Sequence, residues 1–332
     1  MKKTLKALLL LLAVVFVFST LISCNNTVDE SDFGSDGYIL DGEAKLRPEY
    51  VMTIGSAPVT FQEYRYHYLN TKLDYDGGNE EVWEDYPEYI PVLLNTVEES
   101  LIELYSIRSL CKEAGVESDI DAVYDTIAEY RGEMSRAEFK EGLKSFHLTE
   151  ALYAYVLEGY QLYDKLFDHY FAENGEMAMS DGEVYDYADE YYYHTRHILI
   201  YPNTTMTDAE YEKHIATVLE EAQNAENFDE IIGKYSNDTA MENYGCYFTD
   251  GEKHENYENA VRELEIGEIS EPILTGDGYY IIKRLPVEKE DTEVLRDIIY
   301  NRKYADMIEK RIEEIDVGYS EEYSLIAPTT VK

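Results

Sequence analysis

The sequence predicts an α+β protein, a largely helical chain that contains one compact module with a sheet of about four antiparallel-type strands covered by helices. Two strand-like runs, residues 194–200 and 278–286, bracket the module. Between them, apolar residues recur at helical spacing from Tyr211 to Ala222, which indicates an amphipathic helix able to cover a sheet. Outside the module, apolar residues at near-helical spacing predict one long helix over residues 89–114. A small sheet with helices on its faces is a stable unit of this class.

The first 23 residues have the pattern of a lipoprotein signal peptide. Three lysines precede a short apolar run at residues 7–18, and Leu21-Ile22-Ser23-Cys24 resembles a lipoprotein signal-peptidase box. Cleavage there makes Cys24 the lipid-modified first residue. An uncleaved membrane anchor is the alternative, although the uncharged run is at the low limit for spanning a bilayer.

Composition limits the classes of partner. The 332 residues suffice for about two domains, and the formal net charge of −41 argues against nucleic acid and anionic lipid as partners. A solvated, aggregation-resistant surface is the simple explanation of the acidic excess. After Cys24 only Cys111 and Cys246 remain, without CxxC or Cys/His ligand spacing. We therefore expect no metal site and no structural disulfide.

The segment after the signal peptide and the helical part follow in order. Residues 24–47 are rich in Asp, Ser, Gly and Glu, which predicts a disordered tether. A short strand then precedes a helix for which Thr60 is the expected N-cap, with Glu63 as its capping-box partner. Gly115 is placed to cap the long helix at its C-terminus, and Ser118 or Asp119 to cap the next one. Helices are predicted over residues 61–75, 89–114, 120–131, 135–145, 148–173, about 180–191 and 292–315.

Tyrosine is unusually frequent, with 33 residues in the chain. Tyrosines at helical spacing normally pack half-buried, with the hydroxyl in water. Alternatively, some of them line a groove for unfolded polypeptide, because large rigid aromatic rings with a polar tip suit promiscuous contacts. Both interpretations remain open.

Five segments of the module occur in a characteristic order. They are residues 194–200, 235–238, 245–252, 264–272 and 278–286. In this order they resemble a parvulin (PpiC-type) peptidyl-prolyl cis/trans isomerase domain. The rest of the chain resembles the helical chaperone part of a PrsA/SurA-type extracytoplasmic foldase.

This resemblance implies a domain organisation in which the isomerase module is an insertion. Residues 1–23 are the signal peptide and residues 24–47 the tether. Residues 48–190 form the N-terminal part of a helical chaperone domain. Residues 191–286 form the parvulin-like domain, and residues 287–332 carry the helix that completes the chaperone domain.

Prolyl isomerisation needs neither a nucleophile nor a cofactor. Its barrier of about 18–20 kcal/mol arises because the planar amide must lose its resonance. An enzyme lowers that barrier by favouring the twisted amide, with a desolvated cup for the proline ring and preset hydrogen-bonding groups. The parvulin pattern implies a buried pair of histidines, a facing Asp or Cys, and an apolar proline pocket.

The catalytic positions that the resemblance implies are His197, Asp238 and Tyr280. His197 matches the first family histidine, and Asp238 matches the Asp/Cys position. Tyr280 stands where the second histidine is expected. Its hydroxyl donates and accepts hydrogen bonds, but it cannot exchange tautomers with His197.

The implied substrate-binding positions are Phe248, Lys253, Tyr257 and Asp277. Phe248 matches the loop aromatic, and Asp277 matches the turn before the last strand. Lys253 stands where a pocket Met is usual and Tyr257 where a pocket Phe is usual. The lysine stem can still line the cup.

Other histidines of the module are alternatives for the missing imidazole. His194 and His254 are the nearest, and we expect each to be an exposed surface residue. His197 itself has a second interpretation, as a core histidine without a catalytic role.

Three functions remain in competition. The first is a lipid-anchored extracytoplasmic folding factor, isomerase and chaperone for secreted polypeptides. The second is a holdase whose module binds client segments without efficient catalysis, and the third is an envelope scaffold. The expected partners are unfolded or nascent secreted polypeptides with Xaa-Pro segments, and a membrane through the lipid anchor. No nucleic acid is expected, and a homodimer is left open.

Overall fold

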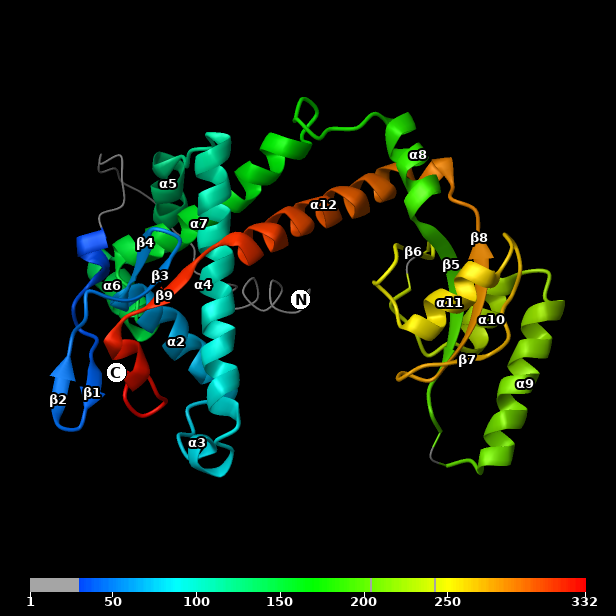
Figure 1. Cartoon of the computed structure of the whole chain (residues 1–332), viewed down its shortest axis with the longest axis horizontal. Coiled ribbons are helices and arrows are strands. Elements are labelled where there is room, and N and C mark those ends of the chain that lie inside the picture. Colours follow the sequence, from blue (N-terminus) through cyan, green and yellow to red (C-terminus); the bar gives the residue numbers. More distant parts are fainter. Residues whose placement is uncertain (1–29, 204, 242) are drawn as a thin grey trace. The chain divides into compact units, whose positions relative to one another are not determined.

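The structure is a computed structural model that describes residues 30–203, 205–241 and 243–332. Contacts divide the described chain into two compact units (Figure 1). Unit 1 holds the described residues up to Glu176 together with Ala305–Lys332, and unit 2 is Met177–Tyr304. The signal peptide and Cys24 lie outside the described residues.

Within these ranges, no helix combines the length and the apolar character that a membrane crossing requires.

Unit 1 contains two small sheets. Strands β1 (Ile39–Asp41) and β2 (Ala44–Leu46) form a hairpin. A three-stranded antiparallel sheet has the order β4-β3-β9 and is built from β3 (Tyr50–Ile54), β4 (Ala57–Thr60) and β9 (Val317–Tyr319). Short 3-10 helices, η1 (Glu30–Phe33) and η3 (Glu321–Leu325), complete this part.

Residues 30–47 are ordered, which contradicts the disordered tether that we predicted for residues 24–47. The backbone N–H of Tyr38 donates to the carbonyl of Lys332 at 3.1 Å, and Ile39 forms a bridge with Val331. Ile39 is fully buried, and Phe33 is buried against other apolar residues. Composition alone missed this order because the partners of these residues come from the far end of the chain.

The helices of unit 1 begin and end close to the predicted positions. They are α2 (Phe61–Asp76), α4 (Tyr89–Ala114), α5 (Ile120–Arg131), α6 (Arg136–Ser145) and α7 (Glu150–Phe171). The short helix α3 (Val82–Asp85) was not predicted. Thr60 and Asp119 accept backbone N–H bonds at the starts of α2 and α5. Gly115 ends α4 with φ 69°.

The side chain of Glu63 does not return to the Thr60 backbone as a capping box requires. It is buried, and its carboxylate accepts a hydrogen bond from the Tyr105 hydroxyl at 2.8 Å. The cap therefore depends on Thr60 alone. Burial of a carboxylate requires such a donor, since an unpaired buried charge is costly.

Apolar clusters of described residues stabilise unit 1, and two of them show how its elements pack. One lies between β3, β4, α2 and α4, with Val51, Val59, Phe61, Leu93 and Leu101 among its buried members. The other joins α5, α6 and α7 through residues such as Ile127, Phe139 and Leu152.

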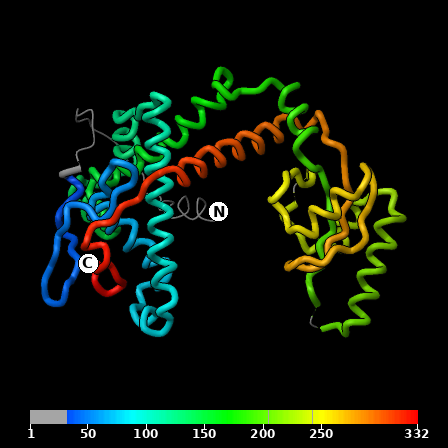
Figure 2. Tube along the Cα trace, in the orientation of Figure 1, coloured from blue at the N-terminus to red at the C-terminus, as the bar shows by residue number. Residues whose placement is uncertain are grey.

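The C-terminal segment closes unit 1. Near the end of helix α12 (Thr292–Glu314), Arg311 donates to the Glu113 carboxylate of α4 at 2.7 Å. The chain then pairs as β9 with β3, so that its last residues (red) lie beside the first strands (blue) in Figure 2. The sequence did not predict this strand.

Unit 2 contains a four-stranded, fully antiparallel sheet in the order β6-β5-β8-β7. Its elements are α8 (Asp181–Tyr191), β5 (Tyr193–Ile200), α9 (Asp208–Asn224), α10 (Phe228–Tyr235), β6 (Cys246–Phe248), α11 (Glu255–Glu263), β7 (Ile273–Leu274), β8 (Tyr279–Leu285), η2 (Lys289–Asp291) and the first part of α12. This architecture confirms the predicted α+β class.

The two faces of this sheet carry different helices. Ile198, Ile200 and Ile281 pack with apolar residues of α9 and α10 on one face. On the other face, Phe248 and Ile282 pack with Tyr257 and Val261 of α11. The alternation of side chains along β5 assigns His197 to the α11 face.

Candidate active site

Pairing of β5 with β8 brings His197 and Tyr280 to one face of the sheet. His197 is opposite Ile282, and Leu199 is opposite Tyr280, so the two side chains are diagonal neighbours. Their rings meet edge to face, with centroids 5.0 Å apart and planes at 78°. Sequence reasoning paired these two residues, and the structure brings them together.

Both ring nitrogens of His197 have partners. Nε2 lies 2.9 Å from the Asp238 carboxylate, and Nδ1 lies 3.1 Å from the Tyr257 hydroxyl. The same hydroxyl lies 2.9 Å from Oγ1 of Thr195. His197, Thr195 and Tyr257 are buried, whereas the side chain of Asp238 retains 25% of its exposure. The four groups form one chain of hydrogen bonds that reaches solvent at Asp238.

The loop after α10 positions Asp238. The backbone N–H of Leu199 in β5 donates to Oγ of Ser236 at 3.1 Å, and the backbone N–H of Tyr201 donates to Oδ1 of Asn237 at 2.9 Å. Oγ of Ser236 also accepts from the backbone N–H of Asp238 at 3.2 Å. The loop is therefore attached to the edge of the strand that carries His197.

Burial and hydrogen bonding set the protonation of this pair. Burial lowers the pKa of His197, although the Asp238 carboxylate acts in the opposite direction. Burial alone raises the pKa of Asp238, but the backbone N–H of Ala240 and His197 outweigh it and hold that pKa below its usual range. At neutral pH the site therefore contains a neutral imidazole beside a carboxylate.

Tyr280 and Asp277 lie at the outer side of the site. The Tyr280 hydroxyl donates to Asp277 at 3.4 Å, and burial raises the pKa of Tyr280 to about 12. Asp277 is exposed and Tyr280 half-buried. The Tyr280 ring thus packs against the His197 ring, while its hydroxyl points to Asp277 in the turn before β8.

Phe248 and Tyr257 occupy the interior beneath the site. They are 1% and 3% exposed, and their rings meet at 72° with centroids 5.7 Å apart. Because both rings are buried and pack against each other, they do not form the open apolar cup that we expected from them. Tyr280 supplies the partly exposed aromatic surface beside His197.

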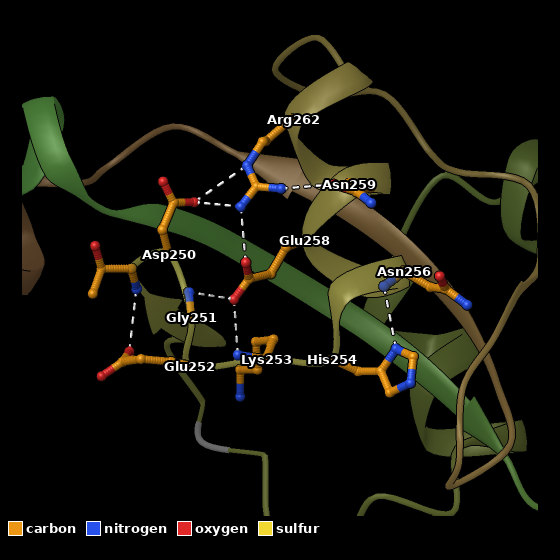
Figure 3. A network of polar contacts seen from close by, with 10 residues as sticks. Asp250, Gly251, Glu252, Lys253, His254, Asn256, Glu258, Asn259 and Arg262 are labelled. Atoms are coloured by element: carbon orange, nitrogen blue, oxygen red, sulfur yellow. Dashed lines mark hydrogen bonds and ion pairs between the residues drawn. The ribbon is translucent and has the colours of Figure 1, made fainter.

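Lys253 is exposed and lies next to the carboxylate network shown in Figure 3. Its ammonium lies 5.9 Å from the Phe248 ring centroid. Its backbone N–H donates to Glu258 at 3.0 Å, and the same carboxylate accepts from Gly251 N–H and from Arg262. The buried Glu258 thereby fixes both the turn before α11 and the helix that carries Tyr257.

The two alternative histidines differ in their placement. His254 is exposed, as expected, and its Nδ1 accepts the backbone N–H of Asn256 at the start of α11. His194 is 4% exposed, which corrects our expectation of a surface residue. Its ring nitrogens lie 2.6 Å from the carbonyls of Pro286 and Tyr244, and its ring stacks on Tyr247. It joins three segments of unit 2 on the sheet face opposite His197.

Sequence reasoning missed Thr195, Ser236 and Glu258. Thr195 is two residues before His197 in the strand, and this alternation was a usable signal that both face the same side. Ser236 precedes Asp238 at the spacing typical of a hydroxyl that binds a nearby backbone N–H. No local signal distinguishes Glu258 from the other acidic residues of α11.

The strand order, the helices on both faces and the His197–Asp238 pair define the class of this module. Residues 197–285 match the family model of the PPIC-type PPIASE domain. The chain therefore carries a parvulin-type peptidyl-prolyl cis/trans isomerase domain.

Longer similarities extend beyond this domain. The Foldase protein PrsA of Caldanaerobacter subterraneus subsp. tengcongensis is 22% identical over 291 residues, which are 82% of this chain and 80% of that relative. The Chaperone SurA of Chromohalobacter salexigens is 29% identical over 132 residues, 37% of this chain but only 30% of that relative. A crystal structure of peptidylprolyl isomerase (PrsA) from Bacillus anthracis aligns with 20% identity and a TM-score of 0.36, covering 65% of this chain and 94% of that one.

Proposed function

We propose that this protein is an extracytoplasmic folding factor, held at a membrane by a lipid on Cys24, that isomerises Xaa-Pro bonds and binds unfolded secreted polypeptides. In this proposal residues 191–286 are the isomerase domain. Residues 48–190 and 287–332 form the chaperone domain, which the β3–β9 pairing supports. The central observation for catalysis is a His197 ring fixed between Asp238 and Tyr257 beside Tyr280.

The arrangement suits a reaction that only requires an amide to twist. The prolyl ring packs on the exposed part of Tyr280, while the carboxylate of Asp238 and the neutral His197 supply fixed polar groups beside the amide. Lys253 and Asp277 border the site, and Phe248 and Tyr257 support it from beneath. Because these groups are hydrogen-bonded in advance, they need little reorganisation when the amide loses its planarity.

A binding-only holdase is the second candidate, and two substitutions favour it. Tyr280 replaces an expected histidine, and Lys253 places a charge at the site. Exposed aromatic residues of unit 1 also suit contacts with unfolded chains. Tyr86 and Tyr89 are exposed, and their rings stack with centroids 5.8 Å apart.

A cis-to-trans rate measurement on an Xaa-Pro peptide tests the catalytic proposal. We expect low but measurable activity in the wild type and its loss in His197→Ala and Asp238→Ala. Asp189→Ala, an exposed carboxylate on α8, is the matched control. An inactive wild type that still suppresses client aggregation would establish the holdase instead.

The anchoring proposal has its own experiment. Cys24→Ser should move the protein out of the membrane fraction or block its processing. A variant that is cleaved and fractionates like the wild type would refute lipid attachment.

A further inference from the structure

The chain of hydrogen bonds at His197 permits one arrangement of protons when the ring is neutral. The Asp238 carboxylate only accepts, so Nε2 of His197 must carry the proton and donate across the 2.9 Å contact. A neutral imidazole has a single N–H, so Nδ1 must then accept. The Tyr257 hydroxyl, 3.1 Å away, is the donor that it meets.

Thr195 completes this arrangement. Once the Tyr257 hydroxyl donates to His197, its oxygen is left as an acceptor 2.9 Å from the Thr195 hydroxyl. Thr195 then donates to Tyr257, and Tyr257 donates to His197. Each buried polar atom in this series has a partner of the correct type, as buried polar groups generally require.

The opposite tautomer makes the contact with Asp238 unfavourable. With the proton on Nδ1, the lone pair of Nε2 would face the Asp238 carboxylate at 2.9 Å. A protonated ring, by contrast, is accommodated when the hydroxyl protons of Tyr257 and Thr195 both reverse direction. The chain therefore tolerates the gain of a proton but selects one neutral tautomer.

We infer that Tyr257 is a positioning residue, whose hydroxyl fixes the Nε2–H tautomer and the orientation of His197 toward Asp238. This inference rests on the proposed function of the site. Tyr257 stands where the parvulin pattern has a pocket phenylalanine, and Tyr280 where it has the second histidine. The hydroxyl of Tyr257 thus provides the partner for Nδ1 that Tyr280 does not provide, because the Tyr280 hydroxyl donates to Asp277.

Nitrogen NMR of the full chain with labelled histidine tests the tautomer without any activity measurement. In the wild type at neutral pH we expect His197 to have its proton on Nε2 and a hydrogen-bonded, accepting Nδ1. In Tyr257→Phe the Nδ1 resonance should move to that of an acceptor without a donor. A wild-type ring protonated on Nδ1, or an Nδ1 resonance unchanged in folded Tyr257→Phe, would overturn the inference.

Kinetics provide the second readout. One lost hydrogen bond to His197 should lower kcat/KM about tenfold in Tyr257→Phe, with a smaller loss in Thr195→Val. The double variant Tyr257→Phe/Tyr280→His should regain activity relative to Tyr257→Phe, because an imidazole at position 280 can serve Nδ1. A double variant no more active than Tyr257→Phe contradicts the positioning role. Absence of wild-type isomerase activity alone would refute the proposed function and leave the NMR test decisive for Tyr257.

The variants also separate positioning from packing. Tyr257→Phe retains the ring that contacts Phe248 and Val261 and removes only the hydroxyl. If Tyr257→Phe does not fold, the wild-type tautomer and the Nδ1 resonance of Thr195→Val decide the question. The inference is rejected if the wild-type His197 ring carries its proton on Nδ1 and the Nδ1 resonance is unchanged in folded Thr195→Val.

Discussion

The backbone N–H of Asn237 donates to the carbonyl of Leu199 at 2.7 Å, which ties the loop that carries Asp238 to the strand that carries His197. The hydroxyl of Ser236 reinforces the attachment, since it accepts from the N–H groups of Leu199 and Asp238. The distance between the two proposed catalytic residues is therefore set by this loop.

Ser236→Ala should weaken catalysis without unfolding unit 2. It removes an acceptor of two backbone N–H groups, each worth about 1 kcal/mol, and loosens Asp238. We expect kcat/KM on an Xaa-Pro peptide to fall about tenfold, with retained secondary structure by circular dichroism. Thr239→Ala, an exposed residue of the same loop, is the control. Equal activities of the two variants would show that the loop does not depend on Ser236.

The pH dependence of catalysis should have a single acid limb. Burial lowers the pKa of His197 below its usual value of about 6.5. The ring is therefore neutral at pH 7 and gains its proton only at a pH below about 6.5. Activity should be constant above that value and fall as the pH decreases further. In Asp238→Asn the acid limb of the residual activity should move to lower pH, because the carboxylate that favours protonation of His197 is gone. A limb that moves upward in this variant would contradict the assigned pair.

The free energy of unfolding should also decrease at acid pH because of these two groups. The pKa values of His197 and Asp238 in the folded state are both depressed. Their contribution to the free energy of unfolding is complete above their unfolded values and is lost as the pH falls through the folded ones.

His67 of α2 should make unit 1 sensitive to acid. Burial lowers its pKa to about 4, and its Nε2 is shielded from solvent without a hydrogen-bond partner among the described residues. Between pH 6.5 and 4 the unfolded chain binds the proton more readily, so acidification costs up to roughly 3 kcal/mol of unfolding free energy. Urea titrations at pH 7 and 5 should show this loss in the wild type and in the control His254→Gln, but much less in His67→Phe. The same pH dependence in all three proteins would exclude His67 as its source.

Gly278 should be required for the turn into β8. Its φ is +144°, and an added Cβ would lie 2.3 Å from the carbonyl oxygen of Ile200. Gly278→Ala should therefore lower the free energy of unfolding of unit 2 by roughly 1–3 kcal/mol. Gly276→Ala, two residues earlier, meets nothing within 4 Å and is the control. Denaturant midpoints that coincide for the two variants would disprove this steric requirement.

Local sequence patterns were sufficient for most helices. Helices α4 and α5 have the predicted bounds because their caps, Gly115 and Asp119, lie in the sequence beside them. The His197–Tyr280 neighbourhood also followed, since the family pattern places both residues on adjacent strands.

Long-range pairings accounted for what was missed. The burial of His194 depends on the carbonyls of Pro286 and Tyr244, and the order of Ile39 depends on Val331. The hydroxyl of Tyr257 likewise finds His197, sixty residues away, through the tertiary fold. A residue pattern predicts which side chain lies near the site, but not which atom of another segment it will meet.

Tyr280→His should raise the isomerase rate. In the wild type the Tyr280 ring meets His197 edge to face, and its hydroxyl donates to Asp277, so it adds little polarity to the site. An imidazole at this position can hydrogen-bond to His197 and exchange tautomers with it.

The expected gain in kcat/KM lies between about tenfold and a thousandfold, because fixed polar groups of this kind contribute up to a few kcal/mol to the barrier. The measurement is the cis-to-trans rate on an Xaa-Pro peptide, with peptide contacts mapped by chemical-shift changes. Tyr279→His is the matched control, since Tyr279 lies on the opposite sheet face with Ile281. A gain confined to Tyr280→His would mean that the wild-type rate is limited by the missing imidazole. If neither variant gains activity while peptide shifts persist, unit 2 acts by binding alone.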